Sequence, residues 1–182
     1  PPLADRRVRF VGEPVALVFA PTRAQAEDLA ERIEIDYDDL PVHANVVSAL
    51  AADAVLLHEG WLDNRFVTLK ADRDFDALAA MADVVVKRRI DLSRQCMVPL
   101  EGKAVLAYWD HQADQLVVYT STQVPHMIRS GIARFLDLEE GQVRVVSPDV
   151  GGGFGYKCVL QQEELCIAWL AKTYQRPFRY LE

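Results

Sequence analysis

The first forty residues carry apolar positions in two different patterns, one typical of strands and one typical of a helix. Residues 14–20 form a β-prone apolar run, which predicts a strand buried on both faces. Thr22 and Gln25 form a capping box, and the apolar residues that follow lie on one helical face up to Ile33. Residues 34–37 then alternate as in a strand. These three elements predict a compact α/β unit.

The rest of the chain continues to mix the two patterns. Short β-prone runs predict strands at residues 66–69, 84–92, 104–109, 115–121, 142–146 and 179–182. Helices are predicted at residues 75–81, from Pro125 onward and at residues 163–172. The second helix has a core-facing stripe formed by Ile128, Ile132, Phe135 and Leu136. The third is apolar on nearly all sides, which predicts burial. The fold class that follows is α+β, with helices and strands mixed along the chain.

The domain organisation depends on a polar, turn-prone stretch at residues 58–64, which we interpret as a linker. It separates a first domain, residues 1–57, from a second, residues 65–182. The chain begins at Pro1 without a methionine and ends at Glu182 inside a predicted strand. We therefore expect it to be a piece of a longer protein.

Composition excludes several classes of function. A net charge of −7 with no basic block argues against nucleic-acid binding, and the longest apolar run, residues 165–171, is too short to span a bilayer. The three cysteines form no Cys-x-x-Cys pair, which favours reduced thiols and a cytoplasmic protein, with export to the periplasm left open. The four histidines are scattered, so no metal site built from side chains is expected.

The most unusual segment is the glycine loop, in which four glycines at positions 151, 152, 153 and 155 surround Phe154. Bare backbone amides just before a helix suit an anionic or oxo group, although a tight connection without a ligand has the same composition. A Gly-x-Gly-x-x-Gly fingerprint starting at Gly151 needs glycine at position 156, where Tyr156 stands. A P-loop needs Gly-Lys-Ser/Thr, but Lys157 lies between Tyr156 and Cys158. Neither nucleotide fingerprint fits.

Five motifs in a fixed order make a family resemblance specific. They are residues 12–18 (GEPVALV), 35–41 (IDYDDLP), 95–102 (QCMVPLEG), 121–126 (STQVPH) and 149–157 (DVGGGFGYK). The set resembles the molybdopterin-binding large subunit of the xanthine dehydrogenase, aldehyde oxidase and carbon monoxide dehydrogenase family. The resemblance implies the end of an α/β-hammerhead domain in residues 1–57 and the first part of a molybdenum-cofactor-binding domain in residues 65–182.

The resemblance also implies roles for single residues. Gln123 matches the family glutamine whose amide hydrogen-bonds an apical ligand of the molybdenum, while its alternative role is to cap the following helix, with Thr122 assisting. Gly153, Phe154 and Gly155 match the loop that places backbone amides and a ring over the metal centre. The alternative is a packed phenylalanine behind a flexible loop.

Cys158 is the main departure from the family pattern. In members that hydroxylate xanthine, a glutamate follows the lysine of this loop and hydrogen-bonds the purine. A thiol supplies neither that acceptor nor its charge, so the resemblance implies a substrate-proximal Cys158 and another heteroaromatic or an aldehyde as substrate; the alternative is a structural thiol. Glu101 is interpreted as structural.

The resemblance finally implies oxidative hydroxylation with water as the oxygen source. The cofactor would be molybdenum–molybdopterin, in a cytosine dinucleotide form, with 2Fe–2S and FAD centres on partner subunits or domains and homo-oligomers possible. No residue matches the family's general base, so no catalytic residue, no direct metal ligand and no activity are expected of this chain alone. Two alternatives remain: a non-catalytic α/β module that binds an anionic ligand or a partner through residues 151–155, and a nucleotide-binding domain with a degenerate loop.

Overall fold

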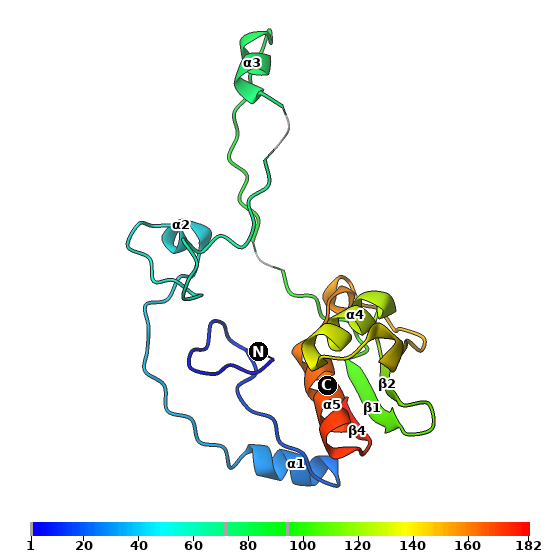
Figure 1. Ribbon diagram of the computed structural model, residues 1–182. Coiled ribbons are helices and arrows are strands. Elements are labelled where there is room, and N and C mark those ends of the chain that lie inside the picture. Colours follow the sequence, from blue (N-terminus) through cyan, green and yellow to red (C-terminus); the bar gives the residue numbers. More distant parts are fainter. Residues whose placement is uncertain (1, 71–72, 94) are drawn as a thin grey trace. The chain divides into compact units, whose positions relative to one another are not determined.

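The computed structural model describes residues 2–70, 73–93 and 95–182. Its contacts divide the chain into two units. The larger unit lies within residues 1–30 and 94–182, and the smaller unit within residues 31–93. The mixed helix and strand content confirms the predicted fold class (Figure 1).

The larger unit contains a four-stranded sheet with the strand order β3-β2-β1-β4. Its strands are β1 (Ala104–Asp110), β2 (Gln115–Thr120), β3 (Val143–Val146) and β4 (Phe178–Leu181). β1 pairs antiparallel with β2 and with β4, whereas β3 runs parallel to β2. The turn of the β1–β2 hairpin forms because the Asp110 carboxylate accepts hydrogen bonds from the backbone N–H groups of Gln112 and Ala113. The predicted hairpin, the strand before the glycine loop and the last strand are confirmed.

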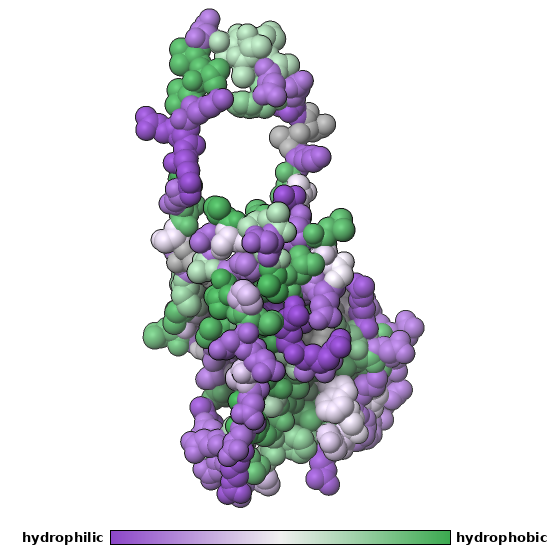
Figure 2. Space-filling model, turned by 90° about the vertical axis from the view of Figure 1, so that its left-hand side faces the viewer, coloured by the Kyte–Doolittle hydropathy of each residue, from purple (hydrophilic) through white to green (hydrophobic). Residues whose placement is uncertain are grey.

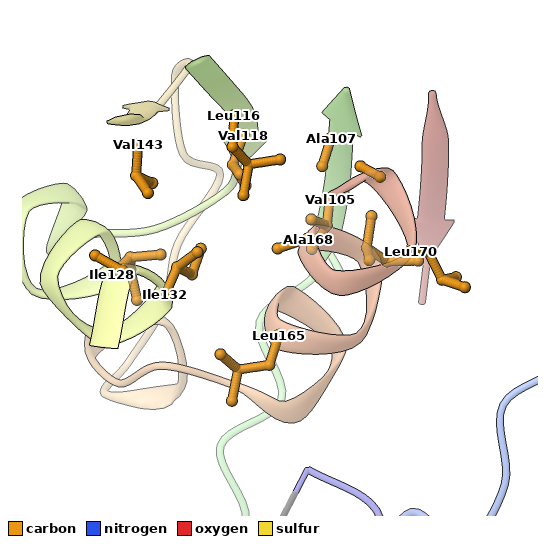
Figure 3. Close-up of a cluster of buried hydrophobic side chains, with 13 residues drawn as sticks. Val105, Ala107, Leu116, Val118, Ile128, Ile132, Val143, Leu165, Ala168 and Leu170 are labelled. Carbon is orange, nitrogen blue, oxygen red and sulfur yellow. The ribbon is translucent and has the colours of Figure 1, made fainter. Parts of the chain in front are cut away.

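Two helices, α4 (Pro125–Leu136) and α5 (Gln162–Tyr174), pack on this sheet. In the β1–β2 register Val105 is opposite Thr120 and Ala107 is opposite Val118, so alternate residues of both strands face the same side. α4 packs on β3, and α5 packs on β1 and β4. The apolar core therefore fills the space between strands and helices, as Figure 3 shows. It consists of Val105, Ala107, Leu116, Val118, Ile128, Ile132, Ala133, Val143, Leu165, Ile167, Ala168, Leu170 and Ala171.

Two details of the helices differ from the sequence pattern. α1 (Arg23–Ala30) begins after Thr22, whose hydroxyl accepts a hydrogen bond from the Gln25 N–H, but it ends before Ile33. In α4, Ile128 and Ile132 are buried as predicted, whereas Phe135 is 60% exposed. Helical spacing places Phe135 one residue away from the centre of the apolar stripe, and the shorter Leu136 takes the core position instead.

The smaller unit has little regular structure. It contains α2 (Val46–Ala49), capped by Asn45, and α3 (Phe75–Ala80), capped by Asp74. α3 confirms the predicted short helix, but no strand forms among its described residues, so the strands predicted at 34–37, 66–69 and 84–92 are wrong. The strand predicted at residues 14–20 of the larger unit is wrong as well. A strand requires hydrogen-bonding partners, and no paired strand accompanies these segments in the part of the chain described.

The apolar residues of the three segments in the smaller unit remain at the surface. Phe66 is 88% exposed and Ile90 is 80% exposed, and Figure 2 shows apolar side chains at the surface beside hydrophilic ones. Across residues 2–70, 73–93 and 95–182, no helix combines the length and the apolar character that a membrane crossing requires. The linker that the sequence places at residues 58–64 stays a prediction.

Candidate functional site

The site begins where β2 ends, at residues 121–123. Ser121 and Thr122 are buried, and the Lys103 ammonium donates to the Ser121 carbonyl at 3.0 Å. The Thr122 hydroxyl donates to the Lys157 carbonyl at 3.2 Å, and the Gln123 N–H donates to the same carbonyl at 3.0 Å. Two hydrogen bonds therefore fix this segment to Lys157, which follows the glycine loop, and a third fixes it to Lys103.

The glycine loop, residues 151–155, connects β3 to the short 3-10 helix η2 (Tyr156–Cys158). At Gly153 the need for glycine is steric. A Cβ at this position would overlap the Gln123 side-chain oxygen and would lie 3.2 Å from the Lys157 Cβ. The loop backbone can therefore lie against the Gln123 amide only because residue 153 has no side chain.

The Gln123 side chain contacts the loop rather than the helix. Its Oε1 accepts a hydrogen bond from the Cys158 thiol at 3.1 Å, and its Nε2 has no acceptor among the described residues. α4 has no side-chain cap, and the Val124 N–H that opens the helix bonds the Thr122 hydroxyl at 3.2 Å. The alternative in which Gln123 caps α4 is therefore wrong, and the structure brings Gln123, Gly153 and Cys158 into one cluster.

Phe154 and Gly155 form the exposed tip of the loop. Phe154 has a φ of +50° and its residue surface is 76% exposed, so the alternative of a packed phenylalanine is wrong. Gly155 has a φ of +94°, which L side chains rarely adopt, and a Cβ there would lie 3.0 Å from the Met97 sulfur. The tip thus presents an aromatic ring and backbone on the surface of the larger unit.

An ion pair with one buried partner, which the sequence patterns did not predict, joins this loop to residue 101. The Lys157 side chain is fully buried, and its Nζ lies 2.6 Å from Glu101 Oε1. The hydrogen bond from Lys157, together with one from the Gly151 backbone, holds the pKa of the Glu101 carboxyl below its ordinary value. The sequence contains one indication that Lys157 has a structural role: it ends a segment of four glycines and two aromatic residues, 151–157, that does not match a P-loop.

A second ion pair, which is fully buried, joins the residue before β1 to α5. Lys103 Nζ lies 2.8 Å from Glu164 Oε1, and both side chains are fully buried. Glu164 also accepts hydrogen bonds from the Thr120 hydroxyl at 2.6 Å and from the Gln161 N–H at 2.8 Å. The second of these belongs to the capping box that opens α5.

A groove of about 630 Å³ borders the loop. It is lined by Gln95, Cys96, Met97, Val98, Pro99, Gly102, Tyr156 and Glu182. The Tyr156 hydroxyl donates to the Glu182 carboxylate at 3.4 Å, and burial raises the pKa of Tyr156 to about 12. Tyr156 therefore keeps its proton at neutral pH and acts here as a hydrogen-bond donor.

The donors at this site fit an oxo or anionic group. Gln123 Nε2 offers two N–H donors, and the glycine loop adds backbone with no side chains of its own at four of its five positions. Within the described residues, no group of three or more His, Cys, Asp or Glu side chains could hold a metal ion. The donors that are present can hold an oxo or anionic group through hydrogen bonds.

Comparisons with known proteins give the family. Residues 57–182 match the model of the molybdopterin cofactor-binding domain, and residues 1–41 match the a/b hammerhead domain of aldehyde oxidase and xanthine dehydrogenase. The chain is 32% identical to the carbon monoxide dehydrogenase large chain of Hydrogenophaga pseudoflava, covering 99% of this chain and 24% of that protein. It is 33% identical to the nicotine 6-hydroxylase large subunit of Paenarthrobacter nicotinovorans, covering 100% and 22%.

Solved structures agree with the sequence matches. Quinoline 2-oxidoreductase from Pseudomonas putida 86 superimposes with a TM-score of 0.86 at 34% identity, over 100% of this chain and 23% of that one. Aldehyde oxidoreductase from Desulfovibrio gigas gives a TM-score of 0.84 at 29% identity, over 99% and 20%. The chain spans about a quarter of the length of the curated relatives that it matches.

The fold and the matched domains define a molybdopterin cofactor-binding protein with a hammerhead segment. The chain belongs to the xanthine dehydrogenase, aldehyde oxidase and carbon monoxide dehydrogenase family of molybdopterin-binding large subunits. This confirms the resemblance drawn from the five sequence motifs.

Proposed function

We propose that this chain is part of the catalytic subunit of a molybdenum hydroxylase, which inserts an oxygen atom from water into an aldehyde or an N-heteroaromatic substrate. The observation that carries the proposal is the cluster of Gln123, Gly153 and Cys158, where an amide donor, side-chain-free backbone and a thiol meet. Membership of the molybdopterin-binding family over nearly the whole chain supports the same assignment.

The proposed cofactor is molybdenum–molybdopterin in its cytosine dinucleotide form, held in part by Gln123, Gly153, Phe154 and Gly155. When bound, this cofactor supplies the redox chemistry that takes two electrons from the substrate. Gln123 contributes two N–H donors from a side chain whose Oε1 accepts a hydrogen bond from the Cys158 thiol, and donors held in place at a site stabilise developing negative charge there. The exposed ring of Phe154 offers an apolar surface at the tip of the same loop for a bound group to cover.

Cys158 bears on the substrate class that we propose. Its thiol donates its one hydrogen to Gln123 Oε1, so this position offers a bound molecule neither a free donor nor a carboxylate. A purine with several ring N–H groups would leave donors unpaired here, and each unpaired buried donor costs roughly 1–3 kcal/mol. We therefore propose an aldehyde or an N-heteroaromatic other than a purine.

The rest of the activity is assigned to parts outside this chain. We propose that the general base belongs to another region of the full-length subunit, that electrons leave through 2Fe–2S and FAD centres on partner subunits or domains, and that the protein works in the cytoplasm. The cysteines Cys96, Cys158 and Cys166 are all free, which is typical of a reducing compartment. The isolated 182-residue chain is then expected to bind no molybdenum and to show no turnover.

The test is a comparison of Gln123→Ala with a matched glutamine variant in the full-length subunit. Gln115→Ala is the control, because Gln115 also uses its amide, donating to the Gly141 carbonyl at 2.8 Å. Gln123→Ala should lower kcat by roughly 10²-fold, the effect of losing one preorganised donor, while Gln115→Ala should leave kcat unchanged. Molybdenum per protomer and turnover with a panel of aldehydes and N-heteroaromatics, using a dye as electron acceptor, are the measurements.

A full-length subunit that binds no molybdenum and oxidises none of these substrates would refute the proposal. Saturable binding of an inorganic anion that is lost in Gly153→Ala would then favour the non-catalytic α/β module. Equal turnover of both glutamine variants would remove Gln123 from the site.

A further inference from the structure

The ion pair of buried Lys157 and half-exposed Glu101 contacts the glycine loop at its first residue. The Gly151 N–H donates to the Glu101 carboxylate. A Cβ on Gly151 would lie 2.6 Å from Glu101 Oε2 and 2.9 Å from Glu101 Cβ, so the loop backbone packs directly on this side chain. Glu101 therefore joins the start of the loop to the ammonium of Lys157.

Lys157 also contacts the middle of the loop and Gln123. Its carbonyl accepts the hydrogen bonds of the Gln123 N–H and the Thr122 hydroxyl, and its Cβ limits the space at Gly153 to 3.2 Å. One fully buried residue thus has contacts at Gly151 through Glu101, at Gly153 through its Cβ, and at Gln123 through its carbonyl. The other fully buried lysine, Lys103, has Ser121 and Glu164 as its partners instead.

We propose that Glu101 and Lys157 are a positioning pair that holds the glycine loop and the Gln123 amide in the geometry needed at the cofactor. The proposal rests on the proposed function for the cofactor, but its effect on the loop stands on the contacts alone. A buried ion pair adds little net stability over an apolar pair of the same size, whereas it fixes one arrangement of the groups around it. The Lys157–Glu101 distance of 2.6 Å and the carboxylate's second bond to Gly151 restrict the loop in this way.

Lys157→Met is the informative variant, because it leaves the Glu101 carboxylate, 42% exposed, in reach of water and so permits folding. The double variant Glu101→Gln with Lys157→Met removes both charges at nearly constant size. Lys103→Met is the matched control, since it removes an equally buried lysine from a pair that does not include the loop. All three are made in the full-length subunit.

The first readout needs no cofactor. The rate at which a thiol reagent labels Cys158, followed by peptide mass spectrometry, reports on the loop, because the Cys158 thiol is tied to Gln123. Buried Cys166 in α5 reports on global unfolding in the same sample. Lys157→Met and the double variant should label Cys158 about tenfold faster or more, with Cys166 unchanged. Lys103→Met should instead change both cysteines together.

The second readout is molybdenum per folded protomer together with kcat and KM. The double variant should recover the melting temperature of the wild type but keep a lowered kcat, at least tenfold below wild type, with KM little changed. Unchanged labelling of Cys158 in Lys157→Met and in the double variant would overturn the positioning role. Full recovery of kcat in the double variant would also overturn it, because the pair would then serve stability alone. If Cys158 labels faster in both variants but the full-length subunit never contains molybdenum, the ion pair still positions the loop and the proposed function is refuted instead.

Discussion

Adding one methyl group at Gly153 should separate the stability of the fold from the function of the site. In Gly153→Ala the new Cβ overlaps the Gln123 side-chain oxygen, lies 2.9 Å from its Cδ and 3.2 Å from the Lys157 Cβ. Lys157 is fully buried and cannot move aside, whereas the end of the Gln123 side chain can rotate. We therefore expect the methyl group to displace the Gln123 amide and to break its hydrogen bond with Cys158.

The cost in stability should be small. Loss of one hydrogen bond costs about 1 kcal/mol, and replacing glycine by alanine returns about 0.4–1 kcal/mol by restricting the unfolded chain. The free energy of unfolding should therefore change by about 1 kcal/mol or less. The amide, however, moves by a distance on the order of 1 Å, and misplacement on that scale can lower a rate roughly 10²-fold.

The assay is a melting curve beside kcat, on the full-length subunit with its molybdenum content measured. Gly141→Ala is the matched control, because a Cβ added at Gly141 would meet no atom within 4 Å and this glycine lies outside the site. It should keep both its melting temperature and its kcat. A normal kcat in Gly153→Ala would show that activity does not depend on the close approach of Gln123 to the loop. A melting temperature far below wild type would show that Gly153 serves the stability of the fold instead.

Three further expectations concern the loop and the two ion pairs. Gly155→Ala should lose activity and roughly 1–3 kcal/mol of stability, because its φ of +94° is strained for alanine. The control Gly12→Ala, at a φ of +93° with open space around it, should lose stability but keep its activity. Equal losses of activity in the two variants would contradict this expectation. Glu164→Gln should destabilise the fold by about 3–5 kcal/mol, since it leaves the buried Lys103 charge without its partner, and a urea titration that detects less than 1 kcal/mol would contradict it. The pKa of Glu101 is lowered from 4.5 in the fold, so its contribution to stability is fully present above that pH and is lost as the pH falls through the lower folded value. The melting temperatures of wild type and Glu101→Gln should accordingly converge in acid, and a constant difference down to the acid transition would contradict the ion pair.

Local patterns were sufficient to predict most elements of the larger unit, although the strand expected at residues 14–20 does not form. The β1–β2 hairpin, α4, the strand before the glycine loop and α5 each follow from a periodicity and a turn or capping signal that lie within a few residues. Strands 34–37, 66–69 and 84–92 failed because apolar alternation describes the side chains of a strand but not the presence of a partner for its backbone. Pairing is a property of distant residues, which a single window of sequence does not contain.

The candidate site likewise contains residues that the sequence predicted and contacts that it did not. Gln123 and the glycine loop were found because their residue types are unusual in one short segment. The ion pair between Lys157 and Glu101 joins residues 56 positions apart, and neither residue type is unusual by itself. Nothing in the spacing shows that both side chains meet, so the contacts that fix the loop emerged only from the fold.

Two hydrogen bonds that hold the loop and its neighbours use the backbone of η2 and do not depend on the side chain at position 158, whereas the Cys158 thiol contacts the Gln123 amide itself. The Lys157 carbonyl anchors Gln123, and the backbone N–H of Cys158 bonds the Gly155 carbonyl at 3.3 Å, whatever side chain follows. Under the proposed function, a substitution at position 158 would therefore keep these backbone bonds while changing both the group offered to the substrate and the partner of the Gln123 amide. A duplicated gene would inherit the backbone of the loop unchanged, and one substitution would alter the chemistry that this backbone presents.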